Sequence, residues 1–304
     1  MIGVVTQEFG DFYGSPIING IERYLRQKNF FFLAVAHRND PVLLETYSHI
    51  LLDRGVEGFI TIDTFIDRPL SLPTIAIPGH RRLKGVTNLV LDHRRGARLA
   101  LNHLIELGHQ EIAFMKGSDL SPDSEDRWKA IREVAKELGI RVRAELIVQL
   151  TGDDATPQLG YPSAIELLAR RRPFTALFAY NDISAIGSIR AFQEAGLRVP
   201  EDVSVVGFDD IKIAVHNNPR LTTVRQPLEE MGEIAARALL NRIEEHADWV
   251  PDIAIEPEFV VRSSTAKAST LAVTQPDRGD FQGHPISAGS EIRSRGVPRH
   301  VRTV

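Results

Sequence analysis

Two carboxylate side chains stand directly after one of the chain's most apolar runs, in a position where they can bind hydroxyl groups. Residues 203–207 read as a buried strand, and Asp209 and Asp210 follow it. Open α/β sheets bind ligands beyond the carboxyl ends of their strands, and a carboxylate accepts hydrogen bonds from paired hydroxyls. Asp209 is therefore a candidate for binding a polyhydroxylated ligand, although two such aspartates taken alone favour a solvated loop.

Other side chains that suit such a ligand also follow predicted strands or begin predicted helices. They are Phe12 and Tyr13 after the first strand, Asp92 after residues 86–91, Arg127 in the first turn of a helix, and Phe178 and Asn181 around the end of residues 175–179. Arginine offers a planar fork of donors, asparagine both donates and accepts, and an aromatic face packs on a sugar ring. In a doubly wound sheet these positions share one edge, which predicts a single site. Two other arrangements stay open: Arg127 pairs with Asp209, or Arg127 lies on an exposed helix face.

The sequence lacks the motifs of the common catalytic and cofactor sites. It holds no G-x-S-x-G, H-E-x-x-H or G-x-x-x-x-G-K-[ST] segment. His103 and His109 lie six positions apart across a predicted helix end, which favours structural hydrogen bonding over metal binding. We therefore predict no cofactor, no metal and no enzymatic activity. An enzyme on this fold would need an acid–base pair, and Asp209 with Asp92 is the candidate.

The elements that must position these side chains alternate between strands and helices. Apolar runs of strand length lie at residues 2–6, 30–36, 56–62, 74–77, 86–91, 112–116, 145–149, 175–179, 203–207, 221–226 and 253–261. Helical spacing between them begins at the predicted caps Ser15, Asp40, Ser124, Ser163 and Asn181 and ends at Gly55, Gly108, Gly139 and Gly196. This alternation predicts an α/β fold whose parallel strands are covered on both faces.

Composition restricts the class of protein further. The chain has 304 residues, of which 43% are hydrophobic, so it can build one or two cored domains. It has no cysteine, no signal-peptide pattern at its start and no apolar run long enough to span a membrane. We therefore expect a cytoplasmic protein with no membrane partner. The net charge of −4, without a basic stripe in the first 260 residues, predicts weak DNA binding by this chain alone.

The last part of the chain has a different character. From residue 267 the helical and strand periodicity stops, and glycine, serine, proline and arginine dominate. Too few apolar residues are present to offset the entropy of ordering, so residues 267–304 are predicted to be disordered. Four arginines make the end of this tail basic, which favours a solvated tail over a contact with nucleic acid.

Several long segments resemble the LacI/GalR family of bacterial transcription regulators. The strongest matches are GARLALNHLIELGHQEIAF at residues 96–114 and TALFAYNDISAIGSIRAFQEAGLRVPEDVSVVGFDDI at residues 175–211. IGVV near the start, GVEGFI, LTTVRQP and EFVVRSST extend the resemblance, in family order, over residues 2–264. The order and length of the match favour a binding role for Asp209 over a solvated loop.

The resemblance implies a periplasmic-binding-protein-like fold of type I. Two similar doubly wound, parallel-sheet lobes would hold the ligand in the cleft between them. The chain would cross between the lobes three times, near His109, Arg225 and Pro251. Residues 1–109 and 226–250 would form the N-terminal lobe, residues 110–225 and 251–265 the C-terminal lobe, and residues 266–304 the disordered tail.

The resemblance also implies a set of effector-binding residues. Arg127 matches the family's ligand-binding arginine, and Asp209 the aspartate that binds sugar hydroxyls. Asn181 matches a frequent ligand contact, Tyr13 and Phe178 match positions that line the cleft, and Gln226 lies near the cleft floor; Phe12 and Asp92 are weaker candidates. Two departures bear on which effector fits: His93 stands where asparagine often follows the aspartate, and the segment SDLSPDSEDRW before Lys129 is atypical.

The function implied is the effector-sensing and dimerisation domain of a transcription regulator. Its partners would be a small sugar-like effector and a second copy of the chain. Operator DNA would bind only through an N-terminal helix-turn-helix module, which the family carries and this sequence does not contain. The alternative is a sugar-binding protein that serves a transporter, against which the missing export signal argues.

Overall fold

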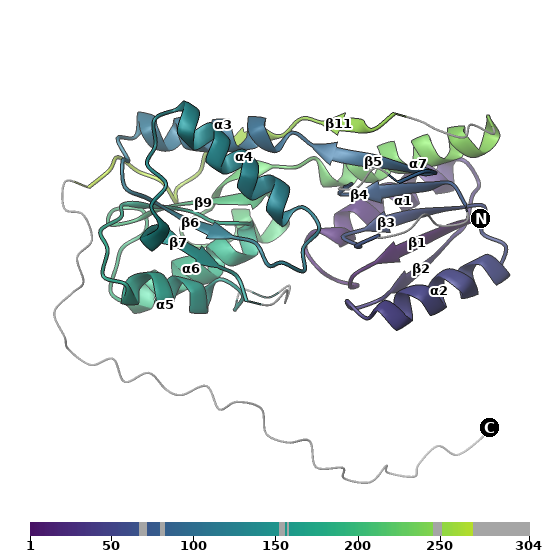
Figure 1. Ribbon diagram of the computed structural model, residues 1–304, viewed down its shortest axis with the longest axis horizontal. Coiled ribbons are helices and arrows are strands. Elements are labelled where there is room, and N and C mark those ends of the chain that lie inside the picture. The colour runs from purple at the N-terminus through teal and green to yellow at the C-terminus, as the bar shows by residue number, and fades with distance from the viewer. Residues whose placement is uncertain (67–71, 80–82, 152–155, 157, 246–250, 270–304) are drawn as a thin grey trace, which may run out of the picture.

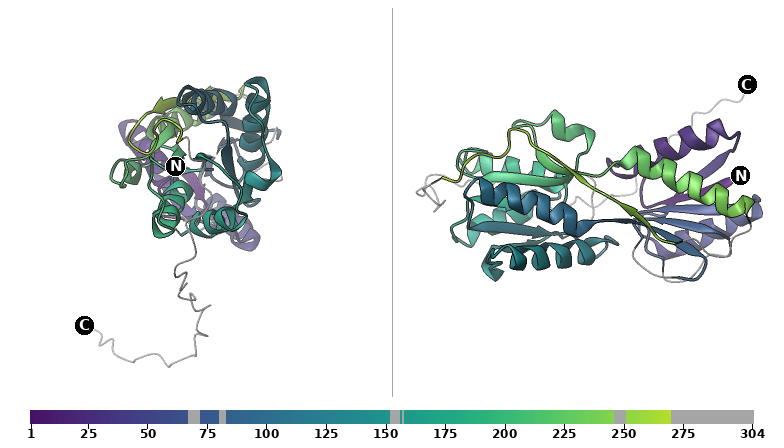
Figure 2. Two further views of the ribbon diagram at one scale, coloured as in Figure 1. Left: turned by 90° about the vertical axis from the view of Figure 1, so that its left-hand side faces the viewer. Right: turned by 90° about the horizontal axis from the view of Figure 1, so that it is seen from above.

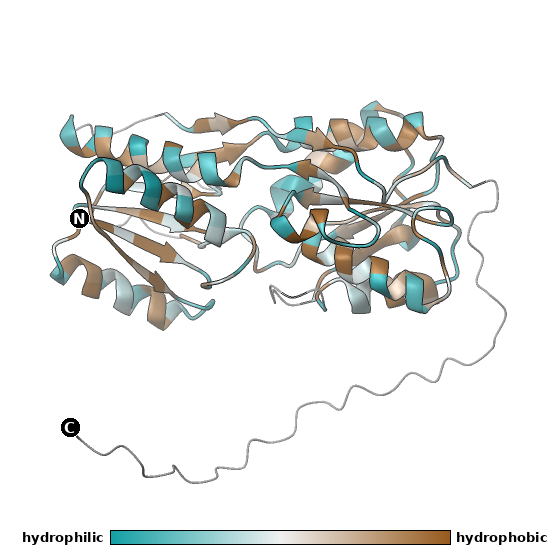
Figure 3. Ribbon diagram, turned by 180° about the vertical axis from the view of Figure 1, so that it is seen from behind, coloured by the Kyte–Doolittle hydropathy of each residue, from teal (hydrophilic) through white to brown (hydrophobic). Residues whose placement is uncertain are grey.

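The computed structural model places two six-stranded sheets side by side, each covered by helices (Figure 1). It describes residues 1–66, 72–79, 83–151, 156, 158–245 and 251–269. The strands of both sheets are largely hydrophobic, while the helices carry polar faces (Figure 3). This confirms the predicted α/β fold of two similar lobes. Among the described residues, no helix has the length and apolar character needed to cross a bilayer.

The first sheet is parallel throughout. In spatial order its strands are β11 (Ile253–Ile255), β5 (Val86–Leu91), β4 (Thr74–Ile77), β3 (Gly58–Ile62), β1 (Ile2–Thr6) and β2 (Phe32–Ala36). The central strands β1, β3 and β4 are buried along their whole length, as expected of strands covered on both faces. Helices α1 (Gly14–Gln27), α2 (Pro41–Asp53) and α7 (Leu228–Glu244) surround this sheet.

The second sheet repeats the arrangement with one antiparallel edge. In spatial order its strands are β12 (Glu258–Val260), β10 (Thr222–Arg225), β9 (Ser204–Asp209), β8 (Ala176–Phe178), β6 (Ile112–Lys116) and β7 (Ile147–Gln149). Only β12 runs against its neighbour. The helices on this sheet are α3 (His93–Glu106), α4 (Ser124–Glu137), α5 (Tyr161–Ala169) and α6 (Asp182–Glu194), with short 3₁₀ turns at Ala144–Leu146 and Lys212–Val215.

The chain crosses between the lobes at places that differ from two of those predicted. Helix α3 packs against α4, β10 and β12, so the first crossing lies at Asp92, between β5 and α3, and not near His109. Strand β11 pairs with β5, so the third crossing lies at Glu256 and Pro257 and not near Pro251. The predicted strand at residues 253–261 is thus two strands, one in each sheet. Figure 2 shows these segments running between the lobes.

Several predicted element ends also move. Helix α1 begins at Gly14 and α5 at Tyr161, so Ser15 and Ser163 do not cap them. Asp123, not Ser124, occupies the N-cap position of α4. The predicted caps Asp40 and Asn181 are confirmed, since each side chain accepts hydrogen bonds from its helix's first turn.

The start of the predicted tail is ordered against the second lobe. The backbone N–H of Ala268 donates to the carbonyl of Leu107, and the carbonyl of Ala266 lies 3.0 Å from His109 Nε2. The prediction of disorder from residue 266 onward is therefore wrong for residues 266–269. Residues 270–304 lie outside the described residues.

Helices α1 and α7 pack backbone to backbone, and two glycines make that approach possible. A Cβ atom on Gly232 would lie 2.1 Å from the carbonyl oxygen of Ile17, and one on Gly20 would lie 1.9 Å from that of Glu229. Arg23 lies beside this contact and forms ion pairs with Glu229 and Glu233. The close packing joins the element that follows β1 to the element that follows the second crossing.

We predict that Gly232→Ala lowers the free energy of unfolding by at least about 2 kcal/mol, because the added methyl group meets backbone that cannot rotate away. Urea denaturation measures the loss. Arg237→Ala is the matched control, since Arg237 lies exposed on the same helix, and it should change stability by less than about 0.5 kcal/mol. Equal stability of Gly232→Ala and the parent protein would show that the helices do not pack as described.

Candidate functional site

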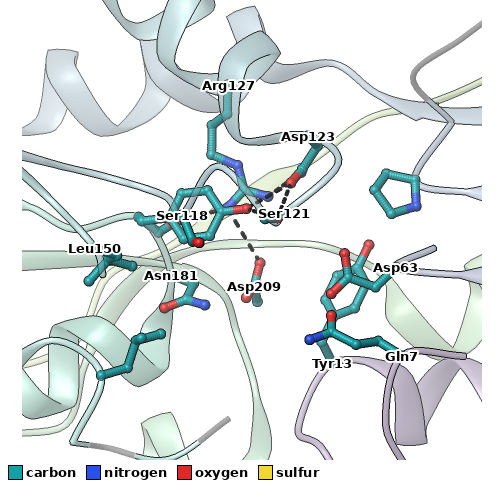
Figure 4. A pocket seen from close by; sticks show the side chains of 13 residues that line it. Gln7, Tyr13, Asp63, Ser118, Ser121, Asp123, Arg127, Leu150, Asn181 and Asp209 are labelled. Carbon is teal, nitrogen blue, oxygen red and sulfur yellow. Dashed lines mark hydrogen bonds and ion pairs between the residues drawn. The ribbon is translucent and has the colours of Figure 1, made fainter. Parts of the chain in front are cut away.

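A pocket lies between the two lobes and is lined by both (Figure 4). The cavity has a volume of ≈ 90 Å³. The lining side chains from the first lobe are Gln7, Tyr13, Asp63 and Pro78. Those from the second lobe are Ser118, Ser121, Asp123, Arg127, Leu150, Leu159, Tyr180, Asn181 and Asp209.

The carboxyl ends of the parallel strands supply much of this lining. Gln7 directly follows β1, Asp63 follows β3 and Pro78 follows β4. In the second lobe, Leu150 directly follows β7 and Asp209 ends β9. The pocket therefore lies where the alternation of strands and helices predicts a ligand site, at facing carboxyl edges of two sheets.

Asp209 and Asp210 form a turn that sends their side chains to different partners. Both have positive φ, at 112° and 56°, a conformation that costs a residue with a side chain on the order of 1–3 kcal/mol. Asp209 points into the pocket and accepts a hydrogen bond of 2.7 Å from Gln226 Nε2. Asp210 is held outside the pocket by Arg225 at 2.7 Å and Arg262 at 2.6 Å. Only one of the two aspartates after this strand is therefore available to a ligand.

The side chain of Asp182 holds the segment after Asp210 by hydrogen bonding. This fully buried carboxylate accepts hydrogen bonds from the backbone N–H of Ile211 at 2.9 Å and from Thr223 Oγ1 at 2.5 Å. A Cβ atom on Gly207 would lie 2.2 Å from Asp182 Oδ1, so glycine is needed there to admit the carboxylate. Burial raises the pKa of Asp182 well above its usual range, with a further contribution from the charge of Asp209.

Arg127 carries a buried positive charge in the part of the pocket that the second lobe lines. Its guanidinium lies between two aromatic rings, 3.9 Å from the Phe208 centroid and 4.5 Å from that of Tyr180. It donates to the carbonyl of Tyr180 at 2.7 Å and to Asp123 Oδ2 at 2.5 Å. Asp209 Oδ1 is further away, at 3.9 Å from Nη1. Arg127 is thus neither on an exposed helix face nor paired mainly with Asp209.

Asp123 is the main partner of that charge. Its second oxygen accepts hydrogen bonds from Tyr180 Oη at 2.8 Å and Ser121 Oγ at 3.3 Å. His93 Nε2, at the first crossing, lies 3.6 Å from Asp123 Oδ2. Asp123 stands at the N-cap of α4 but its side chain makes no cap hydrogen bond, because it faces Arg127 instead. The atypical segment before Trp128 therefore supplies the counter-ion of the arginine.

Burial and neighbouring charges shift the pKa values of the titratable side chains at the pocket. Burial opposes ionisation of Asp123, but Arg127 and its other partners outweigh this and hold its pKa at about 2. Burial raises the pKa of Asp209 to about 7 and that of Asp63 to about 8, and neighbouring carboxylates add to both. Burial also lowers the pKa of His93 to about 4, so its imidazole is neutral at pH 7.

Three buried polar atoms at this site have no hydrogen-bond partner among the described residues: Tyr13 Oη, Arg127 Nε and His93 Nδ1. Buried polar groups are normally paired, and an unpaired one costs about 1–3 kcal/mol. Tyr13 and Arg127 line the pocket, so their unpaired atoms are suited to a ligand's hydroxyl groups. Within the described residues, no cluster of histidines and carboxylates has the arrangement of a metal site.

The structure brings together five of the side chains that the sequence nominates and separates the other three. Tyr13, Arg127, Asn181 and Asp209 line the pocket, and Gln226 stands behind Asp209. Phe178 is buried in the core of the second lobe and Phe12 packs partly against the core, while Asp92 caps α3 by accepting from the N–H of Arg95. Because Asp92 is engaged there, no Asp92–Asp209 acid–base pair faces this pocket.

The residues that the sequence prediction missed fall into two kinds. Asp63 and Gln7 directly follow strands that were predicted, so the same rule of strand ends would have found them. Asp123 and Tyr180 could not be found in this way. Their role depends on the conformation of the loop before α4 and on the point at which β8 ends.

Comparisons with known proteins show which family the sequence and fold resemble. Residues 101–265 match the family described as "Periplasmic binding protein-like domain". The HTH-type transcriptional repressor PurR of Klebsiella pneumoniae is 30% identical over 274 residues, which cover 87% of this chain and 80% of PurR.

Solved structures of two regulators are also similar. A LacI family transcriptional regulator from Enterococcus faecium with bound ribose matches with a TM-score of 0.76 and 29% identity, over 88% of this chain and 99% of that one. The Lac repressor dimer bound to operator and the anti-inducer ONPF matches with a TM-score of 0.76 and 25% identity, over 87% and 93% of the two chains.

We predict that Arg127→Met destabilises the fold by about 3–5 kcal/mol, because it leaves the buried carboxylate of Asp123 without its counter-ion. Adding Asp123→Asn should restore part of that loss, since the neutral amide needs no cation. Urea denaturation of the single and double variants measures both effects. Arg132→Met, on the exposed side of the same helix, is the control. Additive losses in the double variant would contradict the pairing.

Proposed function

Because the chain belongs to the LacI family of transcriptional regulators, whose effector-binding domain it forms, we propose that its interlobe pocket binds a sugar-like effector and thereby controls operator binding. The observation that carries this proposal is the convergence of polar side chains from both lobes on one pocket. Arg127, Asn181 and Asp209 come from the second lobe, and Tyr13 and Asp63 from the first. A polyol needs such a mixture of donors, acceptors and an aromatic face.

The pairing of strands and the packing of helices support lobe boundaries that follow the observed crossings. In the proposed division, residues 1–91 and 228–255 form the first lobe, and residues 93–225 and 258–269 the second. Asp92, Gln226–Pro227 and Glu256–Pro257 then form the three connecting segments. Rotation about these short segments would open and close the pocket.

Effector binding would act by favouring the closed arrangement of the lobes. The effector makes all of its hydrogen bonds only when side chains of both lobes reach it. It therefore binds the closed state more tightly than the open state. A coupling of about 1–3 kcal/mol is typical of such transitions. In the dimer, closure would change how the two first lobes approach each other, and with them the DNA-reading modules of a regulator.

A similar regulator of known structure binds a sugar. The similar regulator from Enterococcus faecium holds ribose. In the present pocket, Asp209 would accept from a pair of hydroxyls, Asn181 would donate and accept, and the unpartnered Tyr13 Oη would bond a further hydroxyl. Which sugar is bound depends on departures such as His93 and Asp123.

We propose that the first lobe contributes the dimer contact through β2 and α2. Strand β2 is the outer strand of its sheet, with an unpaired backbone edge. Apolar side chains are exposed here: Phe31 by 82%, Leu33 by 38%, Val42 by 69% and Ile50 by 44%. These side chains lie on or beside two elements that contact each other, as an interaction surface would require, and the similar Lac repressor is a dimer.

We predict that Asp209→Asn weakens effector binding on the order of tenfold or more while leaving the fold intact, because the amide can still accept from Gln226 but loses its charge. Thermal-shift screening of pentoses, hexoses and hexosamines identifies binders, and calorimetry compares their affinities for the two proteins. Asp126→Asn, on the exposed surface of α4, is the matched control. Unchanged affinity in Asp209→Asn would refute the site assignment.

We predict that the double change Phe31→Asp and Leu33→Asp shifts the dimer toward monomer, because two carboxylates would have to be buried in the contact. Sedimentation velocity at a series of protein concentrations measures the shift. Val261→Asp is the control, since Val261 is also exposed, by 59%, but lies on the second lobe. A double variant as dimeric as the parent would place the contact elsewhere.

A further inference from the structure

The pocket holds more negative than positive charge. Of the described residues that line it, Asp63, Asp123 and Asp209 are acidic and Arg127 alone is basic. His93 borders the site, but burial keeps the pKa of its imidazole at about 4, so it adds no positive charge at pH 7. Ionising all three carboxylates would leave two charges without a counter-ion in a space partly removed from water.

The one cation among the described lining residues is already paired with one of the three acids. Arg127 Nη2 lies 2.5 Å from Asp123 Oδ2, and its guanidinium is fixed between the rings of Tyr180 and Phe208. The same arginine is 3.9 Å from Asp209, too far for a hydrogen bond. The guanidinium cannot turn toward Asp209 without leaving Asp123 unpaired.

The negative charges of Asp63 and Asp209 are therefore not balanced by a closely bonded cation among the described residues. Asp209 has the neutral donor Gln226 Nε2. No hydrogen bond or ion pair joins the Asp63 side chain to another of the described residues, and Figure 4 shows its carboxylate at the pocket beside Tyr13 and Gln7. The two acids belong to different lobes and face one cavity, which also contains the unpartnered Arg127 Nε, on a side chain only 4% exposed, and Tyr13 Oη.

We propose that the effector carries a protonated amine together with hydroxyl groups, as an amino sugar does, and that the amine binds between Asp63 of the first lobe and Asp209 of the second. This inference rests on the proposed function, because it names the chemical class of the ligand for the same pocket. The hydroxyl groups occupy the polar atoms around Arg127, Asn181 and Tyr13. The amine supplies positive charge to two acids that have no closely bonded cation among the described residues.

Ligands of other charge fit this arrangement less well. A neutral sugar can donate hydrogen bonds to the two carboxylates but leaves their repulsion uncompensated. An anionic sugar adds a further negative charge. A cation between the two acids also turns the repulsion between the lobes into an attraction to a shared charge, so the same contact that selects the ligand favours closure.

The protonation of Asp63 and Asp209 agrees with the proposal. The raised pKa values of Asp63 and Asp209, about 8 and about 7, are the consequence of burial and of their acidic neighbours. An ammonium group lowers both, so its binding releases protons, and its affinity rises with pH toward 8 until the amine itself deprotonates. The charged and titratable groups that act on Asp63 are Asp11 and Tyr13 from the first lobe and Asp123, Arg127, Tyr180 and Asp209 from the second.

The test compares sugars that differ only in one amine. Calorimetry at pH 7.5 measures the affinities of D-glucosamine against D-glucose, D-galactosamine against D-galactose, and D-mannosamine against D-mannose, with N-acetyl-D-glucosamine as a neutral amide. The proteins are the parent chain, Asp63→Asn and the control Asp53→Asn, which changes an exposed aspartate of the same lobe. We expect the amine of at least one pair to bind on the order of tenfold tighter than its neutral partner, and Asp63→Asn to remove that preference.

Each outcome decides the matter. A neutral sugar that binds as tightly as its amine, or a preference that survives Asp63→Asn, overturns the amine proposal and leaves the proposed function standing. Failure of every one of these sugars to bind overturns both. Loss of the preference in Asp53→Asn as well would show a general electrostatic effect and would also overturn the assignment to Asp63. A variant that fails to fold is recognised by its thermal melt, and Asp63→Ser then replaces it under the same criteria.

Discussion

The buried guanidinium of Arg127 is the charge around which the pocket is organised. Removing a cation from water costs several kcal/mol, and the protein offsets this cost with partners from several elements. Asp123 at the start of α4 supplies the counter-charge, Tyr180 after β8 a carbonyl and a ring, and Phe208 in β9 a second ring. Arg127 is the only cation that the described lining contains, and it is paired with Asp123. The remaining acids, Asp63 and Asp209, therefore determine the charge that a ligand meets.

Much of the fold could be predicted because its physical signals are local. Strands buried on both faces require continuous apolar runs, and covering helices require apolar residues at helical spacing, so element order and type follow from the sequence. The crossings were harder to predict. The apolar face of α3, with Ala97, Leu101 and Leu104, does not by itself indicate which sheet it covers. Its packing on α4, β10 and β12 assigns it to the second lobe. Likewise, two short strands with Pro257 between them read as one strand.

The site could be predicted only in part, for a related reason. A residue that directly follows a strand can be located from the strand, which is why Asp209 was nominated and why Asp63 was within reach. Phe178 and Tyr180 show the limit. They differ by two positions, but β8 ends at Phe178, which stays in the core, while Tyr180 lies beyond the strand and reaches Asp123. The partner of a buried charge depends on such loop geometry, and no spacing rule contains it.

The turn that presents Asp209 connects the pocket to the segments on which the lobes would rotate. Its two residues with positive φ persist because their surroundings hold them: Asp182 from below, and Arg225 and Arg262 on Asp210. Arg225 ends the strand before the second crossing, and Gln226, within that crossing, donates to Asp209. Gln226 is joined to Asp209 by its backbone N–H as well as by its side chain, so the second connecting segment is bonded directly to the pocket's aspartate. A ligand that binds the carboxylate of Asp209 competes with the hydrogen bond that Gln226 donates to it. Ligand binding and movement of the lobes therefore involve the same atoms.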